Sequence, residues 1–270
     1  MRTYFKLAAI LICIVSIERF CYLQTGGFRI AKIAHTIDTE NKEPPKEEIK
    51  GILKKPFYFL GSGVQSYAFV SQDGRYVLKL FKSYHGWIPT NLLEKIPLSI
   101  AQEMQQARAQ RLHTIFTSCR IAYEKWKPQT ALLYMHLHTA DHFEDPIYII
   151  DPLGIQHIID PNTTAFALQK KAELVHPYLS SLEDKQKAIE SLVSLIVKRS
   201  QAGICNHDPI IHRNFGFVEG QAVEIDIGSF SENAHMKKPY AWKRELFYTL
   251  MNSPELPAQD IAHHFLHEDN

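Results

Sequence analysis

Short apolar runs bounded by turn residues indicate a series of strands in the first half of the chain. In "FYFLGSGVQSYAFVSQDGRYVLKLFK", the runs are residues 57–60, 67–71 and 76–81, and they are rich in the aromatic and β-branched residues that strands favour. "GSG" separates the first two segments, and Asp73 and Gly74, a pair typical of tight hairpins, separate the second two. The pattern predicts a three-stranded β-meander.

Helical periodicity follows the meander. Apolar residues at helical spacing predict a helix over residues 99–116, with Ser99 and Gln102 in the order of a capping box. "TALLYMHLHTADHF" and "PIYIIDPLGIQHIID" predict two more strands separated by "EDP". Further helices are expected over residues 164–176, 184–202, 240–251 and 258–267. Strands followed by helices predict an α+β fold.

The N-terminus carries an uninterrupted apolar run. Arg2 and Lys6 precede "LAAILICIV", and the run extends to Ile17 before Glu18. This length is short for a membrane span, which needs about 20 residues, but it fits the apolar centre of a signal peptide. We expect residues 1–27 to be a signal peptide or signal anchor, and the protein to be exported or membrane-anchored, with membrane association through residues 7–17. The alternative is a buried N-terminal helix, because an A-x-A cleavage site is missing.

Composition narrows the possible partners. The 270 residues are 45% hydrophobic, enough for a globular core, and 30 Lys and Arg against 29 Asp and Glu give a net charge of +1. A balanced charge provides no global footprint for nucleic acid, so no nucleic-acid partner is expected. Four cysteines without a C-x-x-C pair predict neither a disulfide framework nor a zinc site, and Cys119 and Cys205 are left to pair or stay free.

Several residues suited to phosphate and metal chemistry occur in a fixed order. Gly61 and Gly63 flank Ser62 in the first turn, where main-chain N–H groups can approach a phosphate. Lys79 lies on the third strand, sixteen residues after Gly63. The later stretch "HDPIIHRNFGFVEGQAVEIDIGSF" contains three side chains with the oxygen atoms that hard cations prefer, Asp208, Asn214 and Asp226.

In this order, residues 57–230 resemble the protein-kinase-like superfamily, including its small-molecule kinase branch. The resemblance implies a two-lobed fold with a small antiparallel-sheet N-lobe and a compact, mostly helical C-lobe. It places a nucleotide-binding part at residues 56–160 and the helical part at 161–270. Residues 28–55, charged and proline-containing, are expected to be a linker.

The resemblance also implies roles for individual residues. Gly61, Ser62 and Gly63 are similar to the loop that closes over phosphates, although Ser66 stands where the family has a third glycine. Lys79 corresponds to the lysine that contacts the phosphates. The glutamate that pairs with this lysine is expected to be Glu103, with Glu94 as the alternative.

The second half of the resemblance concerns catalysis and metal binding. Asp208 in "NHDPIIHRN" is similar to the catalytic-loop aspartate, and Asp226 in "DIG" to the aspartate of D-F-G. Asn214, a metal ligand in this comparison, stands one residue later than the family spacing. The implied cofactors are ATP and Mg²⁺, and the implied acceptor is an unidentified hydroxyl on a protein or small molecule. The adenine contacts fall somewhere in residues 148–160.

Three interpretations stay open at this stage. The first is an atypical kinase-like phosphotransferase, and the second is an exported or membrane-anchored pseudokinase-like interaction protein without catalysis. The third is an unrelated α+β binding domain. Only 42 residues follow Gly228, without an A-P-E segment, so a regular protein kinase is disfavoured. The pairs His136 and His138, and His263 and His267, lack a third metal ligand at a suitable spacing.

Overall fold

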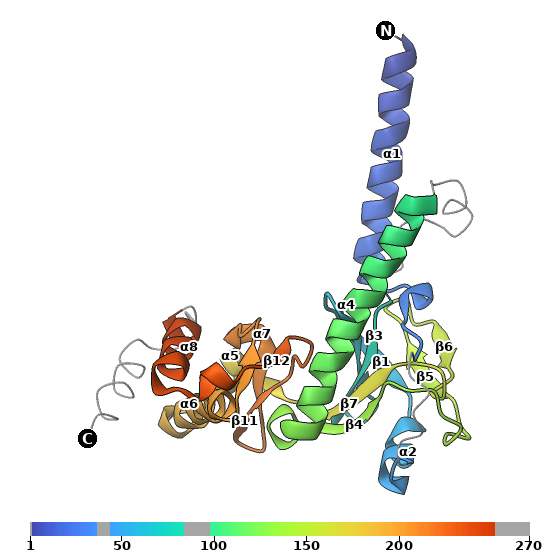
Figure 1. Cartoon of the computed structure of the whole chain (residues 1–270). Helices are drawn as coiled ribbons and strands as arrows, with labels where there is room; N and C mark the ends of the chain where they lie inside the picture. The colour runs from blue at the N-terminus through green and yellow to red at the C-terminus, as the bar shows by residue number, and fades with distance from the viewer. Residues whose placement is uncertain (1, 37–43, 84–97, 252–270) are drawn as a thin grey trace. The chain divides into compact units, whose positions relative to one another are not determined.

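The computed structural model describes residues 2–36, 44–83 and 98–251 (Figure 1). It is a mixed α+β fold with a large, mostly antiparallel sheet, as the sequence predicts. The chain divides into two compact units. Unit 1 comprises Met1–Met104 and His136–Leu168, and unit 2 comprises Gln105–Met135 and Gln169–Asn270. This division differs from a single boundary after residue 160, because residues 105–135 belong to unit 2.

The largest sheet has seven strands in the order β4-β7-β3-β2-β1-β5-β6, of which β1, β2, β3, β5 and β6 lie wholly in unit 1. The strands are β1 (Phe57–Ser62), β2 (Ser66–Ser71), β3 (Tyr76–Phe81), β4 (Leu132–His136), β5 (Ile147–Ile150), β6 (Gln156–Ile159) and β7 (Phe166–Lys170). The predicted meander is confirmed, since β2 pairs antiparallel with both β1 and β3. β1 also pairs with β5 in parallel.

The segment before the meander contributes to the core of unit 1. Phe28 is buried, and its ring centroid lies 5.0 Å from that of Tyr67 and 5.6 Å from that of Phe69. The Ala34 N–H donates to the Phe81 carbonyl at 2.7 Å. Helix α2 (Glu47–Leu53) buries apolar side chains on one face. The range expected as a charged linker, 28–55, therefore adds packing on both sides of the undescribed residues 37–43.

Two predicted elements take a different form. Residues 164–176, expected as a helix, form β7 and β8 (Glu173–Leu174) and only then enter α5 (Val175–Ser181). All residues from Phe166 to Gln169 are buried, so the strand is covered on both faces and lacks the alternation that would mark it. The second of the two later predicted strands is a hairpin, β5 and β6.

Helix α4 (Leu98–Lys125) continues nine residues beyond the predicted end at residue 116. Among its described side chains, the buried apolar ones lie in the second half and include Ile115 and Phe116, whereas Ile100 near its start is exposed.

Unit 2 combines helices with two small sheets. Helices α6 (Gln186–Gln201) and α8 (Pro239–Met251) confirm two predictions, while the helix expected over 258–267 lies outside the described residues. The strand orders are β11-β10-β8 and β12-β9. The new elements are β9 (Ile204–Asn206), α7 (Ile211–Asn214), β10 (Phe215–Val218), β11 (Gln221–Glu224) and β12 (Phe230–Glu232).

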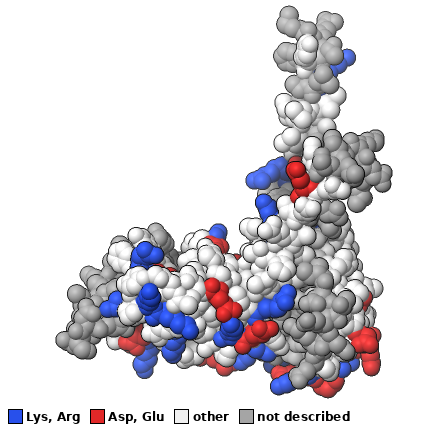
Figure 2. Space-filling model, in the orientation of Figure 1, with Lys and Arg blue, Asp and Glu red and all other residues white. Residues whose placement is uncertain are grey.

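The N-terminal residues form one helix, α1 (Arg2–Thr25). Figure 2 shows its described side chains as mostly uncharged. The exposed apolar ones are Ile10, Leu11, Ile12, Ile14, Val15, Ile17, Phe20 and Leu23. Among the helices that the structure describes, none has the length and apolar character to cross a membrane. Export or membrane anchoring through this segment stays a prediction.

No disulfide joins Cys13, Cys21, Cys119 or Cys205, all of which lie in the described residues. The first of the two histidine pairs lies there as well. His136 and His138 are both buried, with ring centroids 4.9 Å apart, and His136 stacks on Phe166 at 5.2 Å. Within residues 2–36, 44–83 and 98–251, no group of three or more His, Cys, Asp or Glu side chains is arranged to hold a metal ion. Both histidine side chains belong to the buried core of unit 1.

We expect His136 to make the protein less stable in mild acid. Burial, and then the charge of His138, lower the pKa of His136 to about 4. This value lies below the pKa of about 6.5 in the unfolded chain, so His136 is neutral in both states above pH 6.5. As the pH falls toward 4, the unfolded chain binds the proton first and the folded state loses stability. The unfolding free energy should drop by about 2–3 kcal/mol over this window.

Urea unfolding at pH 7.5, 5.5 and 4.5 measures this effect. A His136→Phe variant should have a flatter pH dependence than the wild type, and His113→Gln, at an exposed position on α4, should keep the wild-type slope. Equal slopes for wild type and His136→Phe would contradict the assignment.

Candidate functional site

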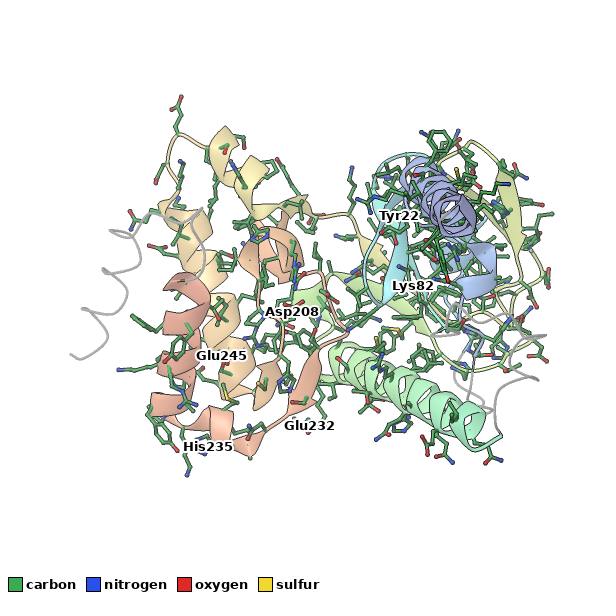
Figure 3. All side chains as sticks on the ribbon, turned by 90° about the horizontal axis from the view of Figure 1, so that it is seen from above. Tyr22, Lys82, Asp208, Glu232, His235 and Glu245 are labelled. Atoms are coloured by element: carbon green, nitrogen blue, oxygen red, sulfur yellow. The ribbon has the colours of Figure 1, made fainter. Side chains whose placement is uncertain are left out.

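The predicted catalytic-loop aspartate lies two residues after the end of β9, and a buried asparagine fixes its main chain. Asn206 Oδ1 accepts a hydrogen bond from the Asp208 N–H at 2.8 Å, and Asn206 Nδ2 donates to Glu224 Oε1 at 3.1 Å. The backbone at Asp208 is therefore held to β11 through one side chain. The Asp208 side chain itself is partly exposed (Figure 3).

Asn214 joins the loop of Asp208 to the segment of Asp226. Its buried side chain donates from Nδ2 to the Asp208 carbonyl at 2.7 Å. Its main-chain carbonyl accepts from the Ile225 N–H at 2.8 Å, one residue before Asp226. Because the amide nitrogen is used in this way, Oδ1 is the end of the amide that can bind a cation. Asn214 thus connects the loop of the predicted catalytic Asp208 to the residue that precedes Asp226, the other predicted metal ligand.

The Asp-Ile-Gly segment is fixed to helix α4. Asp226 Oδ1 accepts from the Gly228 N–H at 3.2 Å. The buried Ser118 hydroxyl donates to the Ile227 carbonyl at 2.7 Å and accepts from the Phe230 N–H at 2.5 Å. These bonds define the path of the backbone around Asp226, whose side chain is half-buried.

Asp208 has a cationic neighbour. The Arg213 guanidinium lies 3.4 Å from both carboxylate oxygens of Asp208. The two side chains are 57% and 38% exposed, so water screens the pair and its contribution to stability is small. The contact can be exchanged for another partner of Asp208 at low cost.

A buried ion network that the sequence patterns did not predict supports this loop. Arg199 of α6 is fully buried and donates to Glu224 of β11 and to Glu245 of α8. Trp126 Nε1 donates to the other Glu224 oxygen at 3.2 Å. Burial raises the pKa of Glu224, while the positive charge of Arg199 opposes this. Since Glu224 also binds Asn206, the network supports the main chain of Asp208.

One signal in the sequence points to this network. Arg199 comes three residues after Ile196 and continues the apolar face of α6. A charged side chain on a buried face needs a partner of opposite charge. Its partners Glu224 and Glu245 are distant in sequence, so the pairing itself requires the fold.

Unit 2 also contains an open pocket of about 560 Å³. Its walls are largely apolar and are formed by Cys205, Asn206, Pro209, Ile210, Met236, Ala241, Arg244, Glu245, Tyr248 and Thr249. A volume of this size suits a small molecule. Asn206, Pro209 and Ile210 connect its wall to the Asp208 loop.

In unit 1 the glycine turn is held by a lysine other than the predicted one. The Gly63 N–H donates to the Ser66 carbonyl at 2.9 Å, which closes the turn. Lys82 Nζ lies 2.8 Å from Ser62 Oγ and also donates to the Gly63 carbonyl. Lys79 pairs with Ala68 in the register of β2 and β3, nearer the middle of the strand, and is partly exposed.

The predicted partner of Lys79 is not buried. Glu103 is exposed on α4, and Glu94 lies outside the described residues. The ion pair between Lys79 and a glutamate stays a prediction. Residues 148–160, expected to contain the adenine contacts, include the β5–β6 hairpin, and no adenine ligand is assigned.

Comparisons with known proteins give a loose structural likeness. No family model matches the chain, and no curated protein matches its sequence. A medium-resolution structure of WbdD, described as a bifunctional kinase-methyltransferase, is 15% identical with a TM-score of 0.37 and covers 72% of this chain and 36% of its own. A high-resolution WbdD structure is 16% identical with a TM-score of 0.36, and the match covers 72% of this chain and 37% of the WbdD chain. The chain thus spans little more than a third of those chains, and the likeness assigns no family.

Proposed function

We propose that the protein is an atypical kinase-like phosphotransferase that moves the γ-phosphate of ATP to a hydroxyl group with Mg²⁺. The observation that supports this most is the double role of Asn214, whose side chain binds the Asp208 carbonyl and whose own carbonyl binds Ile225. It ties a candidate base and a candidate metal-binding carboxylate to one pair of loops. The acceptor is a protein or a small molecule.

The donor set fits Mg²⁺. Asp226 offers carboxylate oxygen and Asn214 offers amide oxygen, and both are hard ligands of the kind this ion prefers. Mg²⁺ is commonly held by one or two protein carboxylates together with substrate phosphates and water. When bound, the ion would neutralise charge on the phosphates.

The remaining residues have roles in binding and proton transfer. Asp208 would orient the acceptor hydroxyl and accept its proton, which requires its exposed contact with Arg213 to give way. Gly61, Ser62 and Gly63 would approach the phosphates through their N–H groups, and Lys79 would supply positive charge. Pairing of Lys79 with Glu103 belongs to the same proposal.

An interaction protein without catalysis, exported or membrane-anchored, is the second candidate. It is favoured by the contact of Arg213 with both Asp208 oxygens, since this cation occupies the group that would act as base. The phosphotransferase would turn over ATP, and the interaction protein would not. An interaction protein that binds no nucleotide would differ also in its affinity for ATP.

Thermal melting of the full chain with ATP, with and without Mg²⁺, tests the proposal. At a ligand concentration 100 times the Kd, binding stabilises the fold by about 2.7 kcal/mol, which raises Tm by roughly 5–10 °C. The shift should require Mg²⁺ and should be lost in Asp226→Asn and reduced in Lys79→Met. Asp141→Asn, at a side chain that is 95% exposed, should behave as wild type. A folded protein that shows no shift with millimolar ATP would exclude the mechanism.

A further inference from the structure

Two lysines converge beside the glycine turn of unit 1. Lys82 follows β3 directly, and its N–H donates to the Gln65 carbonyl at 2.9 Å, which continues the antiparallel register from the Ser66–Phe81 pair. This register places residue 82 opposite the turn that contains Ser62 and Gly63. The position of Lys82 (Figure 3) is therefore set by the β2–β3 hairpin.

Lys32 is held next to Lys82 by main-chain contacts. It ends the short helix η1 (Ile30–Lys32), and its carbonyl accepts from the Ser83 N–H at 2.7 Å. Ile33 and Lys82 form a β-bridge. Each lysine thus neighbours the other's main chain, and the two positive charges repel each other.

The direct contacts of the Lys82 ammonium are with neutral groups. Its Nζ binds Ser62 Oγ and the Gly63 carbonyl and lies 4.3 Å from the ring centroid of Tyr67. Across the described parts of the chain, no carboxylate forms an ion pair with Lys82 or Lys32. A half-buried ammonium group next to a second one is costly without a counter-ion. The arrangement has the charge and the donors of an anion site.

We infer that Lys82, Lys32 and Ser62 form a subsite for a phosphate chain, in which Lys82 makes the direct cationic contact at the glycine turn. The inference deepens the proposed function and rests on it for the identity of the natural ligand. Phosphate oxygens would replace the Gly63 carbonyl as partner of Lys82, accept from the Ser62 hydroxyl, and offset the repulsion between the two lysines. Lys79, three residues earlier in the chain and farther from the glycine turn, would then have a secondary part in phosphate binding.

The subsite should respond to pH in a range where an ordinary lysine does not. Burial, and then Lys32, lower the pKa of Lys82 from 10.5 to about 8. The other titratable groups near it are Tyr67 and, beside Tyr67, Tyr22 of α1 and Arg29. Burial raises the pKa of Tyr67 above its usual 10, so this phenol stays neutral. Because binding needs the charged amine, affinity should hold below pH 8 and fall by up to about tenfold per pH unit above it.

Calorimetric titration of the full chain with inorganic tripolyphosphate, without Mg²⁺, tests the subsite. At pH 7.5 we expect Lys82→Met to weaken binding by at least about tenfold, and Lys79→Met by less than about threefold, if Lys82 makes the charge-assisted contact. Lys82→Arg should bind at pH 7.5 and keep its affinity at pH 9.5, where the wild type should be about thirtyfold weaker than this variant. Melting without ligand checks that each variant is folded.

The outcomes separate the subsite from the phosphotransferase. Failure of folded wild type to bind millimolar tripolyphosphate, or equal binding by Lys82→Met, would overturn the subsite. Tripolyphosphate binding needs neither Mg²⁺ nor Asp226, so a protein that binds it but transfers no phosphate would retain the subsite and lose the proposed function. Parallel titrations with ATP and inorganic phosphate identify the source, and tighter binding of ATP than of tripolyphosphate would support a nucleotide.

Discussion

Replacing Arg199 with methionine should remove a large part of the stability of unit 2. The substitution leaves the buried carboxylate of Glu224, whose side chain is 0% exposed, without its cation. Breaking a buried ion pair by removing one partner typically costs about 3–5 kcal/mol, because the other charge stays buried and uncompensated. This is a large share of the 5–15 kcal/mol by which native proteins are stable.

Urea unfolding followed by tryptophan fluorescence measures this loss. Trp126 is a suitable reporter, since its indole N–H binds Glu224. Arg244→Met, on the exposed face of α8, is the matched control and should change stability by less than about 0.5 kcal/mol. Adding Glu224→Gln to Arg199→Met should restore part of the loss by removing the orphaned charge. A cost below 1 kcal/mol for Arg199→Met would contradict the role of the network.

The second large effect concerns Asp208 and depends on the proposed function. Asp208→Asn should lower the rate of phosphate transfer by about 10²–10⁴-fold, the range that a positioned proton acceptor contributes. The amide keeps the shape of the side chain, and the main-chain bonds that Asp208 makes with Asn206 and Asn214 do not involve the carboxylate. ATP affinity and stability should therefore change little.

Single-turnover measurements with radiolabelled ATP separate transfer from binding. Arg213→Met is the companion variant, because it removes the cation from Asp208 without touching the carboxylate, and it should retain or increase the rate. Asp208→Asn with the full wild-type rate would exclude Asp208 as the base. Absence of turnover in the wild type, with ATP still bound, would favour the interaction protein.

The sequence predicted elements best where one face of a segment meets water. In strands β1 and β2 of the meander every second residue is the more buried one, and helix α6 buries one face, so their periods are visible. β7 fails this condition, because "FALQK" contains good helix formers and its buried residues lie on both faces of the strand. Tertiary packing decided its structure, and no local pattern carried that information.

The candidate site shows the same division. Asp208, Asn214 and Asp226 stay predictions as site residues, but the short stretch of chain between them already indicated that they lie near one another. Lys82 was missed, although the signal was present: a tight turn at Asp73 and Gly74 fixes the register of β2 and β3 and sets residue 82 opposite residue 65. Following that register to its end would have directed attention from Lys79 to Lys82.

The interleaving of the two units constrains how the protein can be made. Unit 1 lacks its second segment until His136–Leu168 has been synthesised, and β1 cannot gain its parallel neighbour β5 before then. At a synthesis rate of about 5–20 residues per second, β1 stays without its neighbour β5 for several seconds. Neither unit can be cut out as a continuous fragment, so slow translation or premature termination within α4 should expose the growing chain to chaperones or to aggregation.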